Sequence, residues 1–490
     1  MRNAPESAIA PMLRAALMSA GSAPQRHRTL TGGSPHTPSG AAEPFAPILV
    51  VAVELAKALP VLRRVPSRCA APYCGVRVLV LLHDIPMGVV WLDFESDELA
   101  PSALAGVIRD ELGDRIRAHL LRDGAEAAAE DSIPVDSLAQ GLGGGCTDVP
   151  SVPRGSKASV VLATRGRPVS LPLAIDALLQ SDHPDFEIVV VDNLPADVRT
   201  ASLISERYSA DPRVRLVAEP NPGLSYARNC GLRAARGDIV AFTDDDVVVH
   251  PSWLSRIAAE FADTAVTCVT GLVEPAELET MWQWWFETAA GFGRGIERRV
   301  YNLATAPDSS PLFPFELGSY GTGASMALRK TALPTGWAFD EALGAGSPAA
   351  GGEDLDFFLD VLALRGTLVY QPAAVCFHRH RKDEAGLHAQ MRGYGRGLTA
   401  LLAKRLLMRP HERALLLRKA AAGFAHLVGP EFRSATKDTV PAAPYPLALR
   451  LQEALGMIEG PATYLLGRRR ARRRQGAWRP ASQYHSSQRS

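Results

Sequence analysis

The chain has 490 residues, of which 47% are hydrophobic and 21% are charged, and its formal net charge is +1. This length leaves room for two to four domains with sizeable cores, and the composition is typical of an ordinary soluble globular protein. No run of 18 apolar residues occurs, so we expect no membrane-spanning helix.

The charge is distributed unevenly along the chain. Residues 391–490 hold 19 Lys and Arg against 5 Asp and Glu, an excess of 14 positive charges. Since the whole chain is at +1, the preceding 390 residues carry −13. The basic surplus therefore lies in the tail, and the candidate site residues described below lie in the acidic part.

The N-terminal stretch offers few signals. Residues 1–45 are rich in Ala, Ser, Pro, Gly and Arg without a period, and we predict that they are disordered. Glu6 and Arg14 interrupt the weakly apolar stretch near the start, a pattern that does not suit a signal peptide. Of the six cysteines, Cys69 and Cys74 lie nearest to each other, but no second pair has metal-ligand spacing. We therefore expect no zinc site and a reducing compartment.

A small α+β module is predicted over residues 46–135. Residues 76–94 read as two β-rich segments around a His-Asp-Ile-Pro-Met-Gly turn, and residues 101–124 have the apolar spacing of a helix. The module carries no chemical signature, so partner binding or domain packing is all that the sequence offers for it. A Gly-rich linker over residues 136–156 follows.

Strands and helices alternate from Lys157 onward. The predicted strands are 158–164, 186–193, 214–219 and 238–244, and the helices between them are 170–181, 196–210 and 223–235. Apolar strands in this alternation predict an α/β fold with a mostly parallel sheet and helices on both faces. We place this domain at residues 157–390 and a basic, helical C-terminal extension with a disordered end at residues 391–490.

Acidic residues follow directly after two of these strands. Asp192 ends the second strand, and Asp244, Asp245 and Asp246 end the fourth. Ligands of such sheets bind beyond the carboxyl ends of the strands, and clustered carboxylates there indicate Mg²⁺ or Mn²⁺. The alternative for the three aspartates is a solvated turn, because a helix is predicted over 250–261. The chain has no Walker-type phosphate loop, and no Gly-rich dinucleotide motif opens the first helix.

Five motifs in a fixed order resemble family 2 glycosyltransferases of the GT-A fold, over about residues 157–400. They are SVVLATRGRP (159–168), EIVVVDN (187–193), GLSYARNCGLRAARGDIVAFTDDD (223–246), GTGASMALRK (321–330) and GGEDLDFFLD (351–360). The resemblance implies an enzyme that transfers a sugar from a nucleoside-diphosphate donor to an acceptor hydroxyl, with inversion by direct displacement.

The resemblance also implies roles for residues that bind the donor. Asp192 would read the donor base, and Thr164 and Arg167 would line the nucleotide pocket. Asp244 and Asp246 would contact the ribose and the metal–diphosphate, with Asp245 between them facing solvent. Two further residues complete the set: Gly323, expected to bind donor, and His378 (or His380 after it), expected to face the metal or diphosphate. Three alternatives stay open. Asp192 could be a helix cap, the arginines could be surface charges, and the histidines could lie in a solvated basic turn.

The pair Glu353-Asp354 would form the catalytic centre, with Asp354 as the general base. A helix begins at these residues, so both carboxylates also suit the positive end of a helix dipole. The two interpretations are compatible, and only the resemblance favours the catalytic one.

Two other segments have less specific patterns. Residues 277–293 concentrate aromatic side chains at helical spacing, which favours a core or domain contact over an acceptor platform. Residues 445–474 combine an amphipathic segment with a run of six arginines, which predicts either contact with an anionic membrane surface or a solvated terminus. Nucleic-acid binding is not expected.

The resemblance, together with these patterns, predicts a cytoplasmic, metal-dependent glycosyltransferase that acts in cell-envelope or natural-product glycan synthesis. A peripheral position on the inner face of the membrane stays open. A nucleotidyltransferase is the chemical alternative, since it shares the α/β architecture and acidic metal sites. A non-catalytic scaffold with a degenerate transferase domain is the other. The presence of all four acids argues against a degenerate transferase domain; they are Asp192, Asp244, Asp246 and Asp354.

Overall fold

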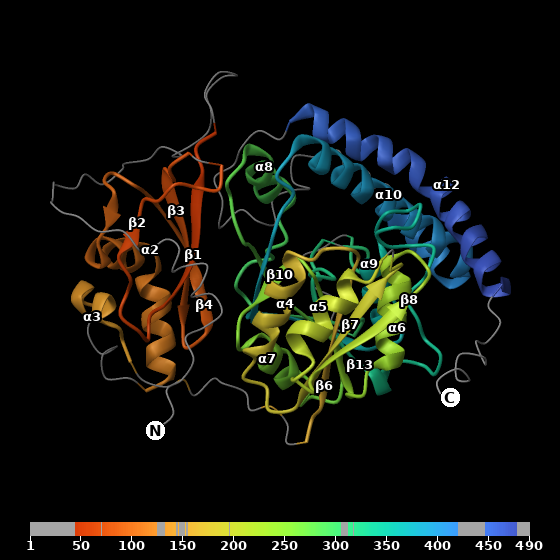
Figure 1. The fold of residues 1–490 in the computed structure, drawn as a ribbon, viewed down its shortest axis with the longest axis horizontal. Coiled ribbons are helices and arrows are strands. Elements are labelled where there is room, and N and C mark those ends of the chain that lie inside the picture. Colours follow the sequence, from red (N-terminus) through yellow and green to blue (C-terminus); the bar gives the residue numbers. More distant parts are fainter. Residues whose placement is uncertain are drawn as a thin grey trace.

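The computed structural model describes most of the chain, namely residues 45–69, 71–124, 133–143, 146, 152, 155–195, 197–304, 312–316, 318–419 and 446–477. The disorder predicted for the two ends falls almost wholly on residues 1–44 and 478–490, which lie outside this described part. Figure 1 shows an N-terminal module beside a larger sheet domain, with two long C-terminal helices across the latter.

The N-terminal module is a three-stranded sheet covered by a helix. Its strands β1 (Ile48–Glu54), β3 (Gly75–Leu82) and β4 (Ile85–Asp93) pair in the order β1-β3-β4, parallel and then antiparallel. The predicted turn between β3 and β4 is His83-Asp84, with φ of 55° and 62°, the backbone conformation that two-residue hairpins favour. Smaller elements complete the module: β2 (Leu62–Arg63), β5 (Glu98–Leu99), α2 (Pro101–Arg122) and α3 (Val135–Gln140).

Four parallel strands form one half of the central sheet. They are β6 (Ala158–Thr164), β7 (Phe186–Asn193), β8 (Val214–Glu219) and β9 (Ile239–Asp244). In their register Thr164 lies opposite Asp192, and Ala163 lies opposite Asp244. The strands therefore end together at one edge, as the alternation of strands and helices predicts.

The other half of the sheet is mixed. It contains β10 (Val247–Val249), β11 (Val266–Pro275), β12 (Arg299–Tyr301), β13 (Ser325–Arg329) and β14 (Thr367–His378), and the main path is β10-β14-β11-β13-β9-β6-β7-β8. The α/β class with mostly parallel central strands is confirmed. Strand β13 runs antiparallel between β9 and β11, a feature that local alternation could not reveal because β13 is distant in sequence from both partners.

Helices cover both faces of this sheet because successive apolar residues of each buried strand point to opposite faces, and both faces must be shielded from water. Val160 and Leu162 of β6 pack in one apolar cluster, and Val161 between them packs in another. The first cluster includes α4 (Ser170–Leu179), α5 (Arg199–Tyr208) and α7 (Trp253–Glu260); the second includes α6 (Leu224–Ala234) and α9 (Glu353–Ala363). Figure 1 shows α4 and α7 on one side of this sheet and α6 and α9 on the other.

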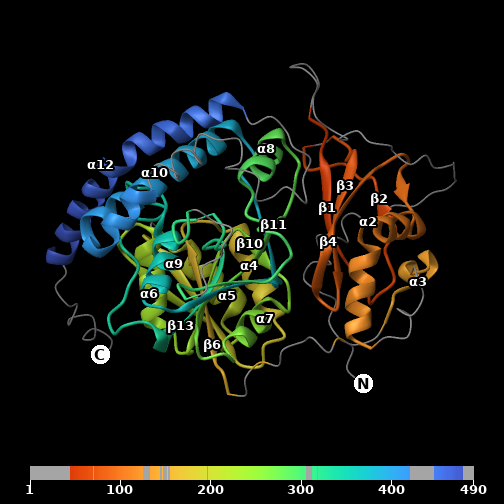
Figure 2. The same ribbon diagram turned by 180° about the vertical axis from the view of Figure 1, so that it is seen from behind.

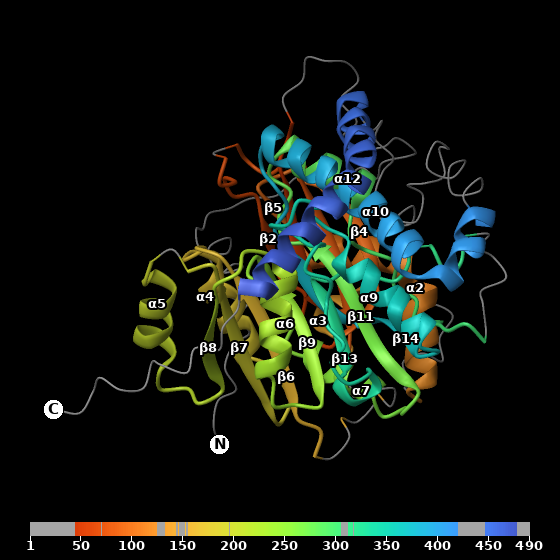
Figure 3. The same ribbon diagram turned by 90° about the vertical axis from the view of Figure 1, so that its right-hand side faces the viewer.

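Helices α10 (Glu384–Met408) and α12 (Leu447–Ala477) lie together above the sheet domain (Figures 1 and 3). Glycines allow close approach: a Cβ added at Gly395 would lie 2.0 Å from the Glu453 carbonyl oxygen, and one at Gly456 2.1 Å from that of Arg392. Two short 3-10 turns, η2 (Lys330–Ala332) and η3 (Pro410–Glu412), complete the elements. No helix in the described part of the chain is both long and apolar enough to cross a bilayer.

The aromatic segment forms a contact between domains. Helix α8 (Met281–Ala290) begins with a capping box made by Thr280 and Gln283. Trp284 packs with its ring edge-on to Trp91 of the N-terminal module, at 5.7 Å between ring centroids. Phe286 packs on the opposite side against α10 and α12. The expected core or domain contact is therefore what the structure shows, and Figure 2 shows α8 between the two bodies.

Candidate active site at the ends of the central strands

Three neighbouring strands bring polar side chains to one edge of the sheet. Strands β6, β7 and β9 are almost wholly buried, and they end in Thr164, Asn193 (after Asp192) and Asp244, of which only Asp244 is partly exposed. Since these strands are parallel and in register, the three ends meet, and the tight turn to β10 adds Asp245 and Asp246 to the same place.

Asp245 does not face solvent, and that expectation was wrong. Only 6% of the residue is exposed, and its carboxylate accepts a hydrogen bond of 2.6 Å from the Thr164 hydroxyl. Arg167 lies 3.2 Å from the same carboxylate and pairs with Asp246 at 2.5 Å. Asp245 is buried because these two donors from the β6 loop replace its water. Thr164 and Arg167 thus hold the turn in place.

Arg228 connects the strand ends to the start of α9, and the sequence analysis did not single it out. It is 3% exposed, and its guanidinium lies 2.8 Å from Glu353 and 3.7 Å from Asp244. It also donates to the Gly323 carbonyl at 3.1 Å. The available signal was the position of Arg228, a charged residue among uncharged residues on the buried face of α6.

Asp354 lies in the same network, through Gly323. Its two carboxylate oxygens accept the backbone N–H groups of Gly323 and Leu355, each at 2.8 Å, which fixes the orientation of the carboxylate. A Cβ added to Gly323 would lie 2.6 Å from Arg228 Nη2, so the guanidinium packs where a side chain would be. The glycine is explained by this contact, and its part in donor binding stays a prediction.

The two histidines of the basic turn have different partners. His378 Nε2 lies 3.5 Å from Asp246, whereas His380 Nε2 lies 2.9 Å from the buried Glu287 on α8. Their Nδ1 atoms are 3.1 Å apart. If His380 is neutral and donates to Glu287, its Nδ1 accepts from His378 Nδ1–H. His378 Nε2 then carries a lone pair toward Asp246, as a metal ligand requires.

Burial opposes the accumulation of negative charge in this cluster. It raises the pKa of Asp244 to about 7 and that of Asp245 to about 6. Burial, together with the neighbouring Asp354, also raises the pKa of Glu353 to about 7. Without a further cation, the protein therefore holds some of these groups protonated at neutral pH.

Asp246 is the exception. Burial would raise its pKa too, but His378 and Arg167 outweigh it and the net effect is a lowered pKa. Burial lowers the pKa of His378 to about 4, so His378 is neutral at pH 7 and Arg167 supplies the positive charge. Asp246 is thus ionised beside an imidazole lone pair.

This donor set fits Mg²⁺ or Mn²⁺. Carboxylate oxygens with one imidazole are suitable ligands, and such cations take one or two carboxylates plus substrate phosphates. Asp244, Asp246 and His378 do not converge into a closed cage of three ligand atoms. An open arrangement of this kind is what a substrate-bridging cation needs.

A hollow lies beside Asp192. It has a volume of about 240 Å³, and burial raises the pKa of Asp192, whose carboxylate accepts a hydrogen bond from Thr200. Its lining is Arg165, Gly166, Asp192, Leu194, Pro195, Asp197, Arg199 and Thr200. A larger hollow of about 660 Å³ is lined by Asp211 and Arg213, just before β8 begins, and thus lies away from the carboxyl ends of the strands.

Comparison with known proteins identifies the central part of the chain. Residues 159–330 match the model of glycosyl transferase family 2. The uncharacterized glycosyltransferase EpsJ of Bacillus subtilis is 36% identical over 86 residues, which are 18% of this chain and 25% of EpsJ. The pre-mycofactocin glycosyltransferase of Mycobacterium tuberculosis is 30% identical over 183 residues, 37% of this chain and 35% of the relative.

Two further similarities are weaker. Succinoglycan biosynthesis protein ExoM of Rhizobium meliloti is 26% identical over 200 residues, 37% of this chain and 57% of ExoM. The mannosyltransferase PcManGT of Pyrobaculum calidifontis, solved with GDP-Man and Mn²⁺, has 20% identity and a TM-score of 0.41, covering 66% of this chain and 89% of its own.

The family match defines the class of domain within the chain. Residues 159–330 form a glycosyl transferase family 2 domain, and four of the five sequence motifs begin within it. The fifth, with Glu353 and Asp354, lies outside the matched range but in contact with it through Arg228 and Gly323. The chain spans about a quarter to a third of the first two glycosyltransferases described above.

Proposed function

We propose that this protein is a glycosyltransferase that moves a sugar from a nucleoside-diphosphate sugar to an acceptor hydroxyl. One observation carries the proposal: Arg228, inside the range that matches glycosyl transferase family 2, joins Asp244 to Glu353, beside Asp354, at the carboxyl edge of the sheet. Two relatives that bear the name glycosyltransferase are at least 30% identical to this chain over the lengths that align.

In the proposed reaction Asp354 acts as the general base. A hydroxyl is a weak nucleophile at neutral pH, so a fixed carboxylate must remove its proton as it attacks the anomeric carbon. The two backbone N–H groups that orient Asp354 leave lone pairs on both of its oxygens for this purpose. Attack opposite the departing diphosphate inverts the anomeric configuration.

Asp246, Asp244 and His378 would hold Mg²⁺ or Mn²⁺ in this proposal. When bound, the cation offsets negative charge on the departing diphosphate. Arg167, which pairs with Asp246, adds a second positive charge at the same edge. Its place beside the turn supports a role in orienting the diphosphate.

The hollow beside Asp192 is the proposed nucleotide pocket. Replacing Asp192 with Asn should weaken binding of the free nucleoside diphosphate at least tenfold, because a hydrogen bond from the base to a charged group contributes about 1.5–3 kcal/mol. Isothermal titration with UDP and GDP measures this loss. Asp211→Asn, in the larger hollow, is the matched control and should bind both nucleotides normally. If Asp211→Asn weakens binding and Asp192→Asn does not, the nucleotide binds in the larger hollow instead.

A turnover assay separates the alternatives. The full chain is incubated with labelled nucleotide sugars, with and without Mn²⁺, and with a mixture of hydroxyl acceptors. Acceptor-dependent release of nucleoside diphosphate supports the glycosyltransferase. In a parallel incubation with nucleoside triphosphates and sugar 1-phosphates, release of pyrophosphate would support a nucleotidyltransferase. No turnover in either mixture would support a scaffold.

The outer face of α12 supports the proposed contact with an anionic membrane. Its inner face packs on α10 through glycines, while large apolar side chains on the opposite face are exposed, 70% at Leu447 and 78% at Ile458. Leu451 and Leu455 belong to the same stripe, which runs into the arginines of residues 468–474. An apolar stripe with a basic end suits the surface of an anionic bilayer. We place the enzyme in the cytoplasm, against this surface.

Sedimentation with lipid vesicles tests the membrane contact. The full chain should pellet with vesicles that contain phosphatidylglycerol and much less with pure phosphatidylcholine. Leu451→Glu with Ile458→Glu should reduce binding at least tenfold, because each removes about 1.5–3 kcal/mol of apolar burial. Leu364→Glu, an equally polar change at an exposed leucine outside α12, is the control. Equal binding by all three proteins would contradict the contact.

A further inference from the structure

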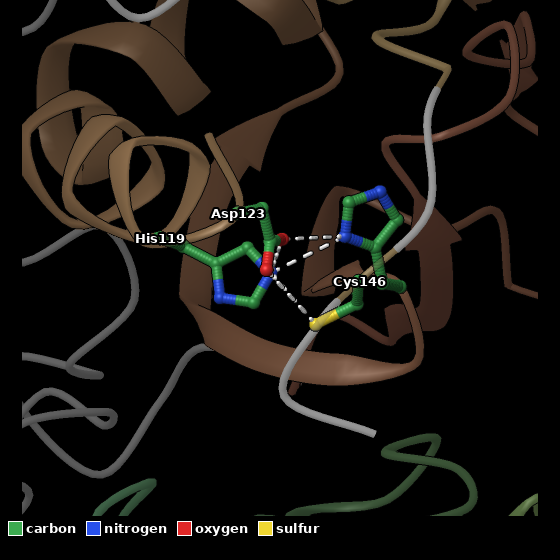
Figure 4. A group of neighbouring side chains, drawn as sticks. His119, Asp123 and Cys146 are labelled. Atoms are coloured by element: carbon green, nitrogen blue, oxygen red, sulfur yellow. Dashed lines mark hydrogen bonds and ion pairs between the residues drawn. The ribbon is translucent and has the colours of Figure 1, made fainter. Parts of the chain in front are cut away.

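Four side chains with metal-ligand chemistry meet in the N-terminal module, far from the strand-end carboxylates. They are His83 in the β3–β4 turn, His119 and Asp123 at the end of α2, and Cys146 in the following segment. Figure 4 labels His119, Asp123 and Cys146, which point toward one another. One ligand atom from each lies within 4.8 Å of every other. Two imidazoles, a carboxylate and a thiol are the ligand types that zinc binds in proteins.

Four of the six separations between these atoms match the edges of a tetrahedron around zinc. Bonds of about 2.0–2.1 Å to nitrogen and about 2.3 Å to sulfur give edges of about 3.3 Å between nitrogens and about 3.6 Å from nitrogen to sulfur. His83 Nδ1 and His119 Nε2 are 3.3 Å apart, and His119 Nε2 lies 3.7 Å from Cys146 Sγ. Asp123 Oδ2 lies 3.1 Å from His119 Nε2 and 3.3 Å from His83 Nδ1.

The surroundings orient the ligands as a metal site requires. His83 Nε2 lies 3.2 Å from the Gly143 carbonyl oxygen, so it carries the ring proton and leaves Nδ1 as the inward lone pair. The Glu54 carboxylate accepts the backbone N–H groups of His83 and Asp84, each at 2.9 Å, and fixes the turn. The side chains of His83, His119 and Asp123 are 7%, 1% and 2% exposed.

We propose that His83, His119, Asp123 and Cys146 form a closed, tetrahedral zinc site with a structural role. Four protein ligands fill the coordination of the metal and leave no position for substrate, which distinguishes structural from catalytic zinc. The thiolate and imidazoles favour Zn²⁺ over the Mg²⁺ or Mn²⁺ proposed for the strand ends.

The expectation of no zinc site rested on the wrong spacing. That expectation considered only paired cysteines. The proposed site uses one cysteine, and its ligands come from a hairpin turn, a helix end and a linker. Only the His119–Asp123 spacing of four residues, one helical turn, was visible locally.

Such a zinc ion would brace the module against the catalytic domain. The carbonyl of His83 accepts a hydrogen bond of 2.8 Å from Arg256 on α7, and the neighbouring Asp84 lies 3.6 Å from His250. Fixing His83 to α2 and to Cys146 therefore holds the hairpin tip at this contact and ties down the linker that leads to β6.

Metal analysis of the full chain tests the site. The purified protein, loaded with zinc and dialysed against metal-free buffer, should retain about one zinc per chain. Cys146→Ser and Asp123→Asn should each lower zinc affinity at least tenfold, and Cys69→Ser, at an exposed cysteine outside the cluster, should not. Asp246→Ala should keep the zinc, which separates this site from the strand-end carboxylates.

Cobalt provides a readout that does not depend on activity or stability. Cobalt bound in place of zinc should show a thiolate-to-metal charge-transfer band in the wild type that is lost in Cys146→Ser. Cys146 lies outside the strands and helices, and matching circular dichroism spectra will show that the variant is folded. The proposal is overturned if the wild-type chain retains no zinc, or if Cys146→Ser retains zinc and the charge-transfer band.

Discussion

Replacing Asp354 with Asn should reduce turnover about 10³-fold while nucleotide binding changes by less than twofold. The amide is almost isosteric with the carboxylate, but it cannot take the proton of an acceptor hydroxyl. Asn also keeps an oxygen for a backbone N–H of Gly323 or Leu355, whereas Ala would remove both acceptors and disturb the start of α9. The measurement is kcat at saturating donor and metal, with nucleotide affinity determined separately.

A control for this variant must remove a helix-start acid without touching the site. Asp383 caps α10 by accepting the Gly386 N–H at 2.8 Å, and in the described part of the chain no hydrogen bond or ion pair joins it to the strand-end acids. Asp383→Asn should leave kcat unchanged. If Asp354→Asn keeps kcat within fivefold of wild type under the same conditions, Asp354 is not the base.

The positions of the strand-end acids could be predicted from the sequence because they depend only on neighbouring residues along the chain. Asp192 and Asp244 each follow a run of apolar residues that is long enough for one buried strand, and parallel strands in register bring such ends together. The α/β class follows from the same alternation. These features need no knowledge of what the side chains touch.

Features that depend on contacts between distant segments could not be predicted in this way. Arg228 gains its importance from Glu353, 125 residues later, and Asp245 is buried because Thr164, 81 residues earlier, donates to it. Strand β13 enters the sheet between β9 and β11 for the same non-local reason. The His83–Cys146 cluster was missed because three separate elements supply it.

Arg77→Met should destabilise the protein by about 3–5 kcal/mol, because it leaves the Glu274 carboxylate buried without its partner. Arg77 on β3 and Glu274 on β11 form an ion pair between the N-terminal module and the sheet domain, with side chains only 1% and 5% exposed. The guanidinium also lies 5.6 Å from the centre of the Trp91 ring. Urea unfolding followed by tryptophan fluorescence reports on this contact, since Trp91 packs against Trp284.

The double variant Arg77→Met with Glu274→Leu decides whether the loss comes from an unpaired charge. Apolar residues of similar size remove the carboxylate that otherwise stays desolvated, so most of the stability should return even though the ion pair is absent. Arg109→Met, which breaks an exposed pair with Asp110, should change stability by no more than about 1 kcal/mol. If the double variant is as unstable as Arg77→Met, packing of the guanidinium on Trp91, rather than its charge, joins the two domains.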